Sequence, residues 1–447
     1  MITDRKLTRS KQHNMKIFSL KTTTFFLFLF AFQASAQQIS PELIATNLWY
    51  KDLKQQVWDM TQAGGVKMVR IGGAQYDKKM PSNEILAEWV LKIQAIGAQP
   101  IMQMPQYQTP EFAAALVRYF NVEKHEGIKP IKYWNIGNEP WLQNKRPEQS
   151  KMGELVETYF KPLAAAMKSV DSTIKIYGPD ECDFQDYYND LFGGKNDITG
   201  LVPGKNYYYC DGLTWHRYPQ SSQDPATIGP KDFYTRSLKA KTKVDEVNAK
   251  HNRTGDMALQ WGIGEYNAKG GPEVHTWGNG QMFGAVLGYA MQFGAKYAAT
   301  WSMFEHGGDR KGSDYSLYDG KNMTPRASYQ HMALVAKYFT GNFVNAICAD
   351  SSVIAYGAND GDQMSVMIMN TGFGEPKKYN LYLNTPKKTK AGLSIVLPAN
   401  RKEVYKDVIP KRSTQVIIFK GKSITKVTYT SDDFDNERPP VTTIIKN

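Results

Sequence analysis

The stretch Tyr133-Trp134-Asn135-Ile136-Gly137-Asn138-Glu139-Pro140 decides the fold. A short apolar run, typical of a buried strand, ends abruptly in Asn138-Glu139-Pro140. Asn and Pro are ordinary turn residues, so the tripeptide alone fits a strand that leaves the core at a turn. A carboxylate at that point equally fits the reactive end of a barrel strand. The rest of the chain distinguishes the two interpretations.

Strand-like runs and helical patterns alternate on both sides of this stretch. Seven further runs have the length and composition of strands, at residues 43–49, 66–71, 100–104, 174–177, 212–216, 258–264 and 297–303. Helical patterns follow them, for example from residue 83 to 96, where Ser82 is expected to cap the start and Gly97 the end. Thr109-Pro110-Glu111 predicts a second capped helix start.

Eight strand–helix units in about three hundred residues predict an α/β fold with a parallel sheet closed into a (β/α)8 TIM barrel. A doubly wound sheet would need a Gly-rich phosphate turn after its first strand, and the sequence has none there. From Gly341-Asn342 onward, short alternating runs separated by turns predict an antiparallel, all-β sandwich without helices. We therefore expect a barrel over 37–340 and a sandwich over 341–447, with an irregular tail after about Thr430.

The N-terminus has the pattern of a cleaved export signal. Basic residues precede the apolar run 25–32, and Ala34-Ser35-Ala36 is a small-x-small cleavage site. The run is too short to span a bilayer. The sequence predicts a signal peptide over 1–36, a mature protein that is secreted or periplasmic, and no membrane attachment after cleavage.

Composition limits the classes of partner. The chain is 41% hydrophobic and 22% charged, as is typical of a folded protein. Residues 1–36 hold six basic and one acidic side chain, so the net charge of +12 falls to about +7 without them. This weak positive charge lacks a dense basic cluster, which argues against nucleic acid and slightly favours an anionic polysaccharide. Three cysteines without CxxC spacing predict buried free thiols rather than disulfides or a metal site.

The expected strand ends carry most of the chemistry-bearing residues. In a (β/α)8 barrel reactive side chains lie where strands enter the following loops. Those positions hold Asn47, Arg70, Asn138, Glu139, Asp180, Glu181, His216, Tyr218, Glu265, Trp301 and Glu305. Random placement would scatter such groups over both rims, so the set indicates one functional mouth.

Two glutamates on facing strands suit glycoside hydrolysis. One must be protonated to donate to the leaving oxygen, and the other must be ionised to attack or to stabilise the oxocarbenium ion. Glu139 ends the fourth expected strand and Glu265 the seventh, which lie roughly opposite in a ring of eight. A retaining mechanism needs their carboxyl groups roughly 5–5.5 Å apart.

The chain resembles the clan A retaining glycoside hydrolases. The residues that carry the likeness are Asn138-Glu139-Pro140, Gly264-Glu265-Tyr266, Val69-Arg70-Ile71-Gly72-Gly73 and Trp215-His216-Arg217-Tyr218. A barrel followed by a β-sandwich is similar to families 30, 39, 51 and 79 of that clan. Gly264 precedes the second glutamate where several families have Thr, so no single family is assigned.

The resemblance implies roles for seven residues. Glu139 would be the acid/base, Glu265 the nucleophile, and Asn138 the group that binds the sugar 2-hydroxyl. The remaining substrate-binding set would be Arg70 and Tyr218, which orient the nucleophile, His216 nearby, and Trp301 as the floor of the −1 subsite. The mechanism requires no cofactor and no metal, and its partner is a carbohydrate.

Other interpretations stay open at the level of sequence. A carbohydrate-binding barrel without hydrolytic activity would keep the fold and lose the chemistry. A barrel lyase or aldolase would need a strand-end Lys for a Schiff base, and none is well placed. Further sugar contacts or merely paired side chains are expected at Gln103, Gln106, Tyr107, Asp180, Glu181 and in the loop 305–321.

Overall fold

The computed structural model describes residues 37–49, 53–123, 125, 127–305, 314–386, 393–399 and 404–446. The expected signal peptide and residues 306–313 of the loop after the eighth strand lie outside these residues. Residues 36–447 form one compact unit. Within the described part of the chain, no helix is both long and apolar enough to span a membrane.

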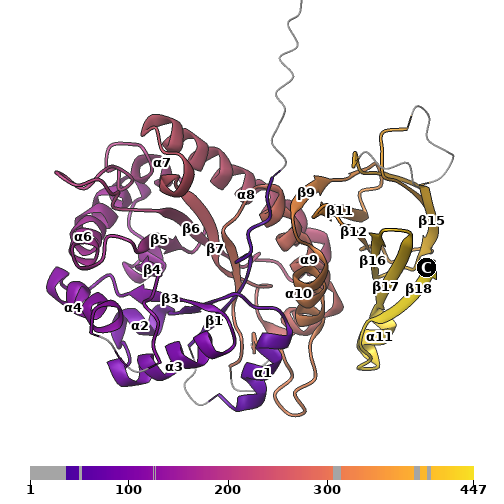
Figure 1. Ribbon diagram of the computed structural model, residues 1–447, viewed down its shortest axis with the longest axis horizontal. Coiled ribbons are helices and arrows are strands. Elements are labelled where there is room, and N and C mark those ends of the chain that lie inside the picture. Colours follow the sequence, from indigo (N-terminus) through magenta and orange to yellow (C-terminus); the bar gives the residue numbers. More distant parts are fainter. Residues whose placement is uncertain are drawn as a thin grey trace, which may run out of the picture. The chain divides into compact units, whose positions relative to one another are not determined.

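Eight parallel strands close into a barrel in chain order (Figure 1), which confirms the predicted fold class. β1 pairs with both β2 and β8, and this pairing completes the ring. The strands are β1 (Ile44–Leu48), β2 (Met68–Ile71), β3 (Gln99–Met104), β4 (Tyr133–Ile136), β5 (Lys175–Glu181), β6 (Gly212–Arg217), β7 (Gln260–Tyr266) and β8 (Tyr297–Thr300).

Helices surround the barrel between successive strands (Figure 1). The long ones are α1 (Gln55–Ala63), α3 (Asn83–Ala95), α4 (Pro110–Asn121), α6 (Gln149–Val170), α8 (Pro225–Lys250), α9 (Trp277–Gln292) and α10 (Ala327–Tyr338). Shorter pieces lie in the connections: α2 (Ala74–Lys78), α5 (Pro140–Gln143), α7 (Tyr188–Leu191), η1 (Gly255–Met257) and η2 (Gly271–His275).

One of the two predicted helix N-caps has the expected side-chain hydrogen bond. The Thr109 hydroxyl accepts a hydrogen bond from the Phe112 backbone N–H at 3.2 Å, as expected for an N-cap. The expected cap at Ser82 is wrong, since its side chain caps no helical N–H. Its hydroxyl instead hydrogen-bonds the Glu84 carboxylate and lowers the pKa of that group.

Several boundaries differ from the sequence-based expectation. β5 and β7 continue past their predicted ends, so Asp180 and Glu265 lie within strands rather than at loop entries. α8 begins eight residues earlier than expected, at Pro225, because Asp224 accepts a hydrogen bond from the Ala226 N–H and caps it there. α10 begins at Ala327 rather than at Thr324-Pro325.

The barrel interior changes from apolar to polar along each strand. Seven buried residues fill the end where the strands begin: Ala45, Met68, Ile101, Tyr133, Tyr177, Tyr297 and Ala299. Two residues further on, at positions that face the same side of a strand, stand buried polar groups such as Asn47, Arg70 and Gln103. An apolar plug therefore supports a polar layer, and the functional groups lie above it.

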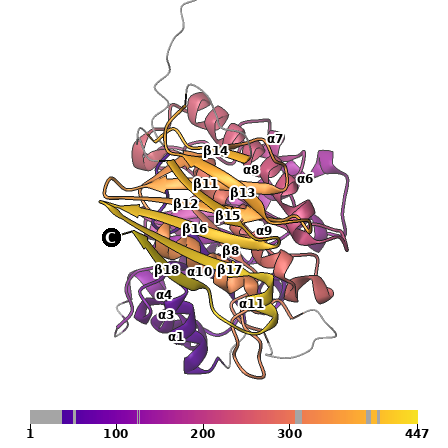
Figure 2. The same cartoon turned by 90° about the vertical axis from the view of Figure 1, so that its right-hand side faces the viewer.

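The C-terminal region has two sheets, as predicted. One has the order β18-β17-β16-β12-β11-β9 and the other β10-β14-β13-β15; Figure 2 looks onto these strands. Their bounds are β9 (Asn342–Asn345), β10 (Ile347–Cys348), β11 (Val353–Asn359), β12 (Gln363–Asn370), β13 (Lys377–Tyr382), β14 (Leu393–Val396), β15 (Val404–Ile409), β16 (Ser413–Lys420), β17 (Ser423–Thr430) and β18 (Val441–Lys446).

Three expectations for this region are wrong. The sheets are not wholly antiparallel, because β13 pairs with β14 in parallel. The region contains a helix, α11 (Ser431–Asp435), which begins in a capping box formed by Thr430 and Asp433. The tail is not irregular either, since β18 pairs with β17.

The three cysteines are free as predicted, but Cys182 and Cys348 are only partly buried.

Candidate active site

Glu139 lies in a strained turn directly after β4. Its φ of 46° is left-handed, which is uncommon for a residue other than glycine, and Gly137 two positions earlier has a φ of 86°. The Glu139 backbone N–H donates to the carbonyl oxygen of Asp180 at 2.8 Å and secures this conformation. The Glu139 side chain remains 17% exposed. The turn thus presents a solvent-accessible carboxylate at the end of the strand.

Glu265 lies in β7 and is only 6% exposed. One of its carboxylate oxygens accepts a hydrogen bond from Arg70 Nη1 at 2.9 Å. The other accepts a hydrogen bond from the Tyr218 hydroxyl at 2.9 Å. Because donors engage both oxygens, the plane of the carboxylate is fixed.

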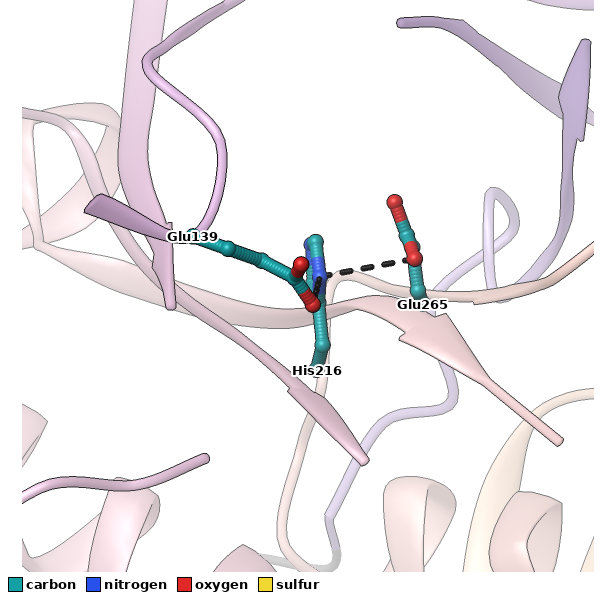
Figure 3. A group of neighbouring side chains, drawn as sticks. All are labelled: Glu139, His216 and Glu265. Carbon is teal, nitrogen blue, oxygen red and sulfur yellow. Dashed lines mark hydrogen bonds and ion pairs between the residues drawn. The ribbon is translucent and has the colours of Figure 1, made fainter. Parts of the chain in front are cut away.

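His216, on β6, lies between the two glutamates (Figure 3). Its Nδ1 is 3.1 Å from a Glu139 oxygen and 3.5 Å from a Glu265 oxygen. One oxygen from each glutamate and this nitrogen all lie within 4.8 Å of one another. One oxygen of each glutamate thus lies within 4.8 Å of the other, which is compatible with the carboxyl separation of roughly 5–5.5 Å that a retaining mechanism needs.

The three acids around His216 control its charge. Burial alone would lower the pKa of His216, but Glu265, Asp180 and Glu139 outweigh it and raise the pKa to about 10. The ring therefore carries a positive charge at neutral pH. Burial raises the pKa of Glu265 above its ordinary value, with a smaller contribution from Glu139, against the opposing effects of His216 and Arg70.

Arg70, on β2, is fully buried beneath the site. Burial lowers its pKa, yet Asp180 and Glu265 outweigh this effect and raise it overall. Its guanidinium donates five hydrogen bonds, to Asp180 (2.9 Å), Asn47 (2.8 Å), Glu265 (2.9 Å), Gln103 (3.2 Å) and Asn138 (2.7 Å). A planar donor with this many fixed partners holds its neighbours in one arrangement.

The oxygen of the Asn138 side-chain amide is hydrogen-bonded within the protein, and its nitrogen is available to a ligand. Its Oδ1 accepts the hydrogen bond from Arg70, and the side chain is buried. Among the described residues, no acceptor pairs with the Asn138 amide nitrogen. The amide N–H groups are thus left as donors for a ligand.

Trp301 forms an aromatic wall at the end of β8. Its ring stacks on Trp49 with centroids 6.1 Å apart and planes 17° apart. Its Nε1–H donates to Glu305 Oε1 at 3.3 Å. On another side it contacts Gly73, where an added Cβ would lie 2.8 Å from the ring. The half-buried ring is therefore held from three directions.

The structure brings all seven candidate residues to one end of the barrel, and most of the secondary candidates have hydrogen-bond or ion-pair partners of their own. Asp180 pairs with Arg70, and Glu181 accepts hydrogen bonds from the Trp141 N–H and the Tyr187 hydroxyl. Gln103 and Gln106 are buried and hydrogen-bonded to Asp77, whereas Tyr107 is 54% exposed.

Two contributors were missed from sequence. Trp49 follows β1 at the rim of the barrel, and its place at a strand end is a sequence signal that identifies it as a candidate. Asp77 lies in α2, a short helix without a sequence signal of its own. Only its contacts reveal it.

The Glu139, His216 and Glu265 group also has the spacing of a metal site. An imidazole binds a metal through a neutral nitrogen, so metal binding here would have to displace a proton held with a pKa of about 10. The arrangement suits an ion-paired proton between two carboxylates better than a metal centre.

One protein-family model matches part of the chain. The family model described as glycoside hydrolase family 44 matches residues 87–238, less than half of the chain. The matched segment includes Glu139 and His216 and ends before Glu265. No curated protein sequence matches the chain.

Solved structures share the fold at low sequence identity. A family 51 α-L-arabinofuranosidase from Bifidobacterium longum is 14% identical, with 86% of this chain and 97% of that one covered and a TM-score of 0.60. The family 51 α-L-arabinofuranosidase of Thermotoga petrophila is 13% identical, covering 88% and 97%, with a TM-score of 0.59. A family 44 xyloglucanase from Paenibacillus polymyxa is 12% identical, covering 85% and 96%, with a TM-score of 0.54.

The fold and the family model together define the class of this protein as a glycosidase. The chain is a clan A glycoside hydrolase that is not assigned to one family of that clan.

Proposed function

We propose that this protein is a secreted retaining glycosidase that hydrolyses O-glycosidic bonds of an oligosaccharide or polysaccharide. The observation that carries the proposal is the pair of glutamate oxygens within 4.8 Å, one carboxylate partly exposed and the other clamped by two donors. An exposed group can exchange protons with solvent, whereas a clamped and buried one is suited to attack.

The first step cleaves the glycosidic bond. Glu139 gives its proton to the leaving oxygen while a Glu265 oxygen bonds to the anomeric carbon, which releases the aglycone alcohol and leaves a glycosyl ester. The ester removes the negative charge of Glu265. In the second step Glu139 takes a proton from water, whose oxygen attacks the anomeric carbon and frees Glu265.

The surrounding residues prepare both steps. Arg70 and Tyr218 hold the Glu265 carboxylate by its two oxygens, so it attacks in one orientation. The His216 cation compensates part of the negative charge of the pair. The free N–H groups of Asn138 are placed to bind the sugar 2-hydroxyl, and Trp301 offers a ring face as the floor of the −1 subsite.

Replacement of each glutamate tests the proposal. Glu139→Gln and Glu265→Gln should each lower kcat by about 10³-fold or more while the far-UV circular dichroism stays unchanged. Intact-mass and peptide analysis after treatment with a 2-fluoro glycoside should place a covalent label on Glu265. Full activity of either variant would contradict the assignment. A wild-type protein that binds glycans but is neither labelled nor active would indicate a carbohydrate-binding barrel instead.

The substrate and the location have separate tests. The positive mature charge favours an anionic glycan, such as a uronate-bearing or sulfated polysaccharide. Reducing-sugar release from a panel of neutral and anionic plant, algal and host glycans would identify the substrate. N-terminal sequencing of the exported protein should begin at Gln37 if the signal peptide is cleaved as predicted.

A further inference from the structure

Asp77 is a buried carboxylate close to the active site that the mechanism above does not use. It lies in α2, immediately after β2, and is 4% exposed. Its two oxygens accept three hydrogen bonds from two glutamines. They come from Gln103 Nε2 (3.1 Å), the Gln106 backbone N–H (3.2 Å) and Gln106 Nε2 (2.8 Å).

An ionised carboxylate only accepts hydrogen bonds, so both glutamines must turn their NH2 groups toward Asp77. Gln103 consequently presents its Oε1 on the opposite side. That oxygen accepts hydrogen bonds from Arg70 Nη2 at 3.2 Å and from the Gly73 N–H at 2.7 Å. The orientation of the Gln103 amide thus decides whether Arg70 meets an acceptor or a donor.

Hydrogen bonds connect both glutamines to Asn138, Gln103 through Arg70 and Gln106 directly. Arg70 Nη2, which contacts Gln103, also donates to Asn138 Oδ1 at 2.7 Å. Gln106 Nε2 reaches the Asn138 backbone carbonyl oxygen at 3.4 Å. Asn138 directly precedes Glu139 in the strained turn, so both sets of hydrogen bonds help to fix the position of the acid/base.

We propose that Asp77 is a positioning residue whose two acceptor oxygens orient Gln103 and Gln106 and thereby hold Asn138 and Arg70 in their working arrangement. The inference rests on the proposed glycosidase function. Among the described residues, the hydrogen-bond partners of Asp77 are the two glutamines and neither catalytic glutamate, so it acts through the amides and not on the substrate.

The energetics favour a functional over a stabilising role. Burial raises the pKa of Asp77 to about 6, although the hydrogen bonds of Gln106 and Gln103 and the charge of Arg70 oppose the rise. The other titratable groups facing it are Tyr159 from α6 and Tyr107 after β3. An ionised carboxylate with a raised pKa opposes folding at neutral pH, because the unfolded chain hydrates the charge better.

Asp77→Asn is the direct test. The two glutamine side chains donate to different oxygens of Asp77, and an amide of the same shape has only one oxygen, so one of the two side chains must turn or lose its partner. We expect kcat to fall by about 10- to 100-fold, the size of effect that a small misplacement of catalytic groups produces. The Tm should stay level or rise, whereas a purely structural role would lower Tm and leave kcat alone.

A charge swap provides the rescue. In Asp77→Asn/Gln103→Glu, the new amide N–H donates to the new carboxylate and the amide oxygen still accepts from Gln106 Nε2. The Gln106 backbone N–H loses its acceptor, while residue 103 keeps an acceptor toward Arg70. The double variant should recover a clear part of the lost kcat, and Gln103→Glu alone should not, because it places two carboxylates against each other. Gln106→Met, which removes the side-chain hydrogen bonds to Asp77 and to the Asn138 carbonyl oxygen, should also lower kcat.

Wild-type kcat in Asp77→Asn, or a double variant no better than the single one, would overturn the inference. The proposed function is checked separately, since it fails if the wild type hydrolyses no glycoside. In that case, crystal structures of the wild type and of Asp77→Asn test whether Asp77 positions Asn138. A displaced Asn138 side chain would support the positioning role, and an unmoved one would overturn it.

Discussion

Arg70 Nη1 and a carboxylate oxygen of Glu265 meet at 2.9 Å inside the barrel, on residues 195 positions apart in the chain. Both side chains are buried, so neither charge is screened by water. The same guanidinium also pairs with Asp180 at 2.9 Å. The Arg70 guanidinium therefore compensates the charges of two buried acids.

Replacing Arg70 should impair both stability and catalysis. Arg70→Lys keeps the charge but cannot reproduce five planar donors, and it leaves buried acceptors without partners. We expect a loss of about 3–5 kcal/mol in unfolding free energy, the range for breaking a buried ion pair, and a fall in kcat of at least 100-fold. Urea denaturation and steady-state kinetics measure these. Arg118→Lys, on the exposed face of α4, is the control and should change neither quantity.

Tyr218→Phe should slow catalysis without unfolding the protein. The substitution removes one donor from Glu265, and the carboxylate then keeps only the hydrogen bond from Arg70. Loss of one hydrogen bond to a charged group is worth about 1.5–3 kcal/mol, or roughly 10- to 100-fold in kcat. Tyr234→Phe is the control, because that ring lies on α8 and is exposed. Equal kcat in the two variants would rule out a role for the Tyr218 hydroxyl.

The charge of His216 predicts a pH dependence of stability. Its pKa is raised to about 10 in the folded state, above the ordinary value of 6.5. The stabilisation is therefore fully present below pH 6.5 and is lost as pH rises toward 10. Unfolding free energy from urea titrations should decline across this window by up to about 1.4 kcal/mol per pH unit. His216→Gln should show a shallower decline, and an identical slope would contradict a charged imidazolium.

Gly73 should prove necessary for the Trp301 wall. Its φ is 116°, and an added Cβ would come within 2.8 Å of the Trp301 ring. Gly73→Ala is expected to displace that ring and raise KM by several-fold. Gly97→Ala is the matched control, since its φ is also positive, at 76°, but its Cβ would meet no atom within 4 Å. Both variants should lose about 1 kcal/mol or more of stability from backbone strain. A KM unchanged in both would show that Trp301 does not contact the substrate.

Much of the architecture was predictable because it depends on short-range patterns. Alternation of apolar strands with amphipathic helices indicates a barrel without any knowledge of distances. It also places Glu139 just after the fourth strand and Glu265 near the end of the seventh. The same approach failed at residues 431–446, where α11 and β18 replace the expected tail. The residues of the α11 capping box, Thr430 and Asp433, are visible in the sequence, and they are the local signal for a helix at this point.

The sequence by itself determined the kind of fold, the two strands that carry the glutamates, and the chemistry that two such carboxylates can perform. Only the tertiary structure decided the separation of Glu139 and Glu265, the insertion of His216 between them, and the role of Asp77. The physical reason is that hydrophobic periodicity is a property of residues close together in the sequence, whereas a hydrogen bond between distant strands depends on the closure of the barrel. Whether a buried amide turns its oxygen or its nitrogen toward Arg70 is settled by partners from other strands and loops, so no local stretch of sequence contains the answer.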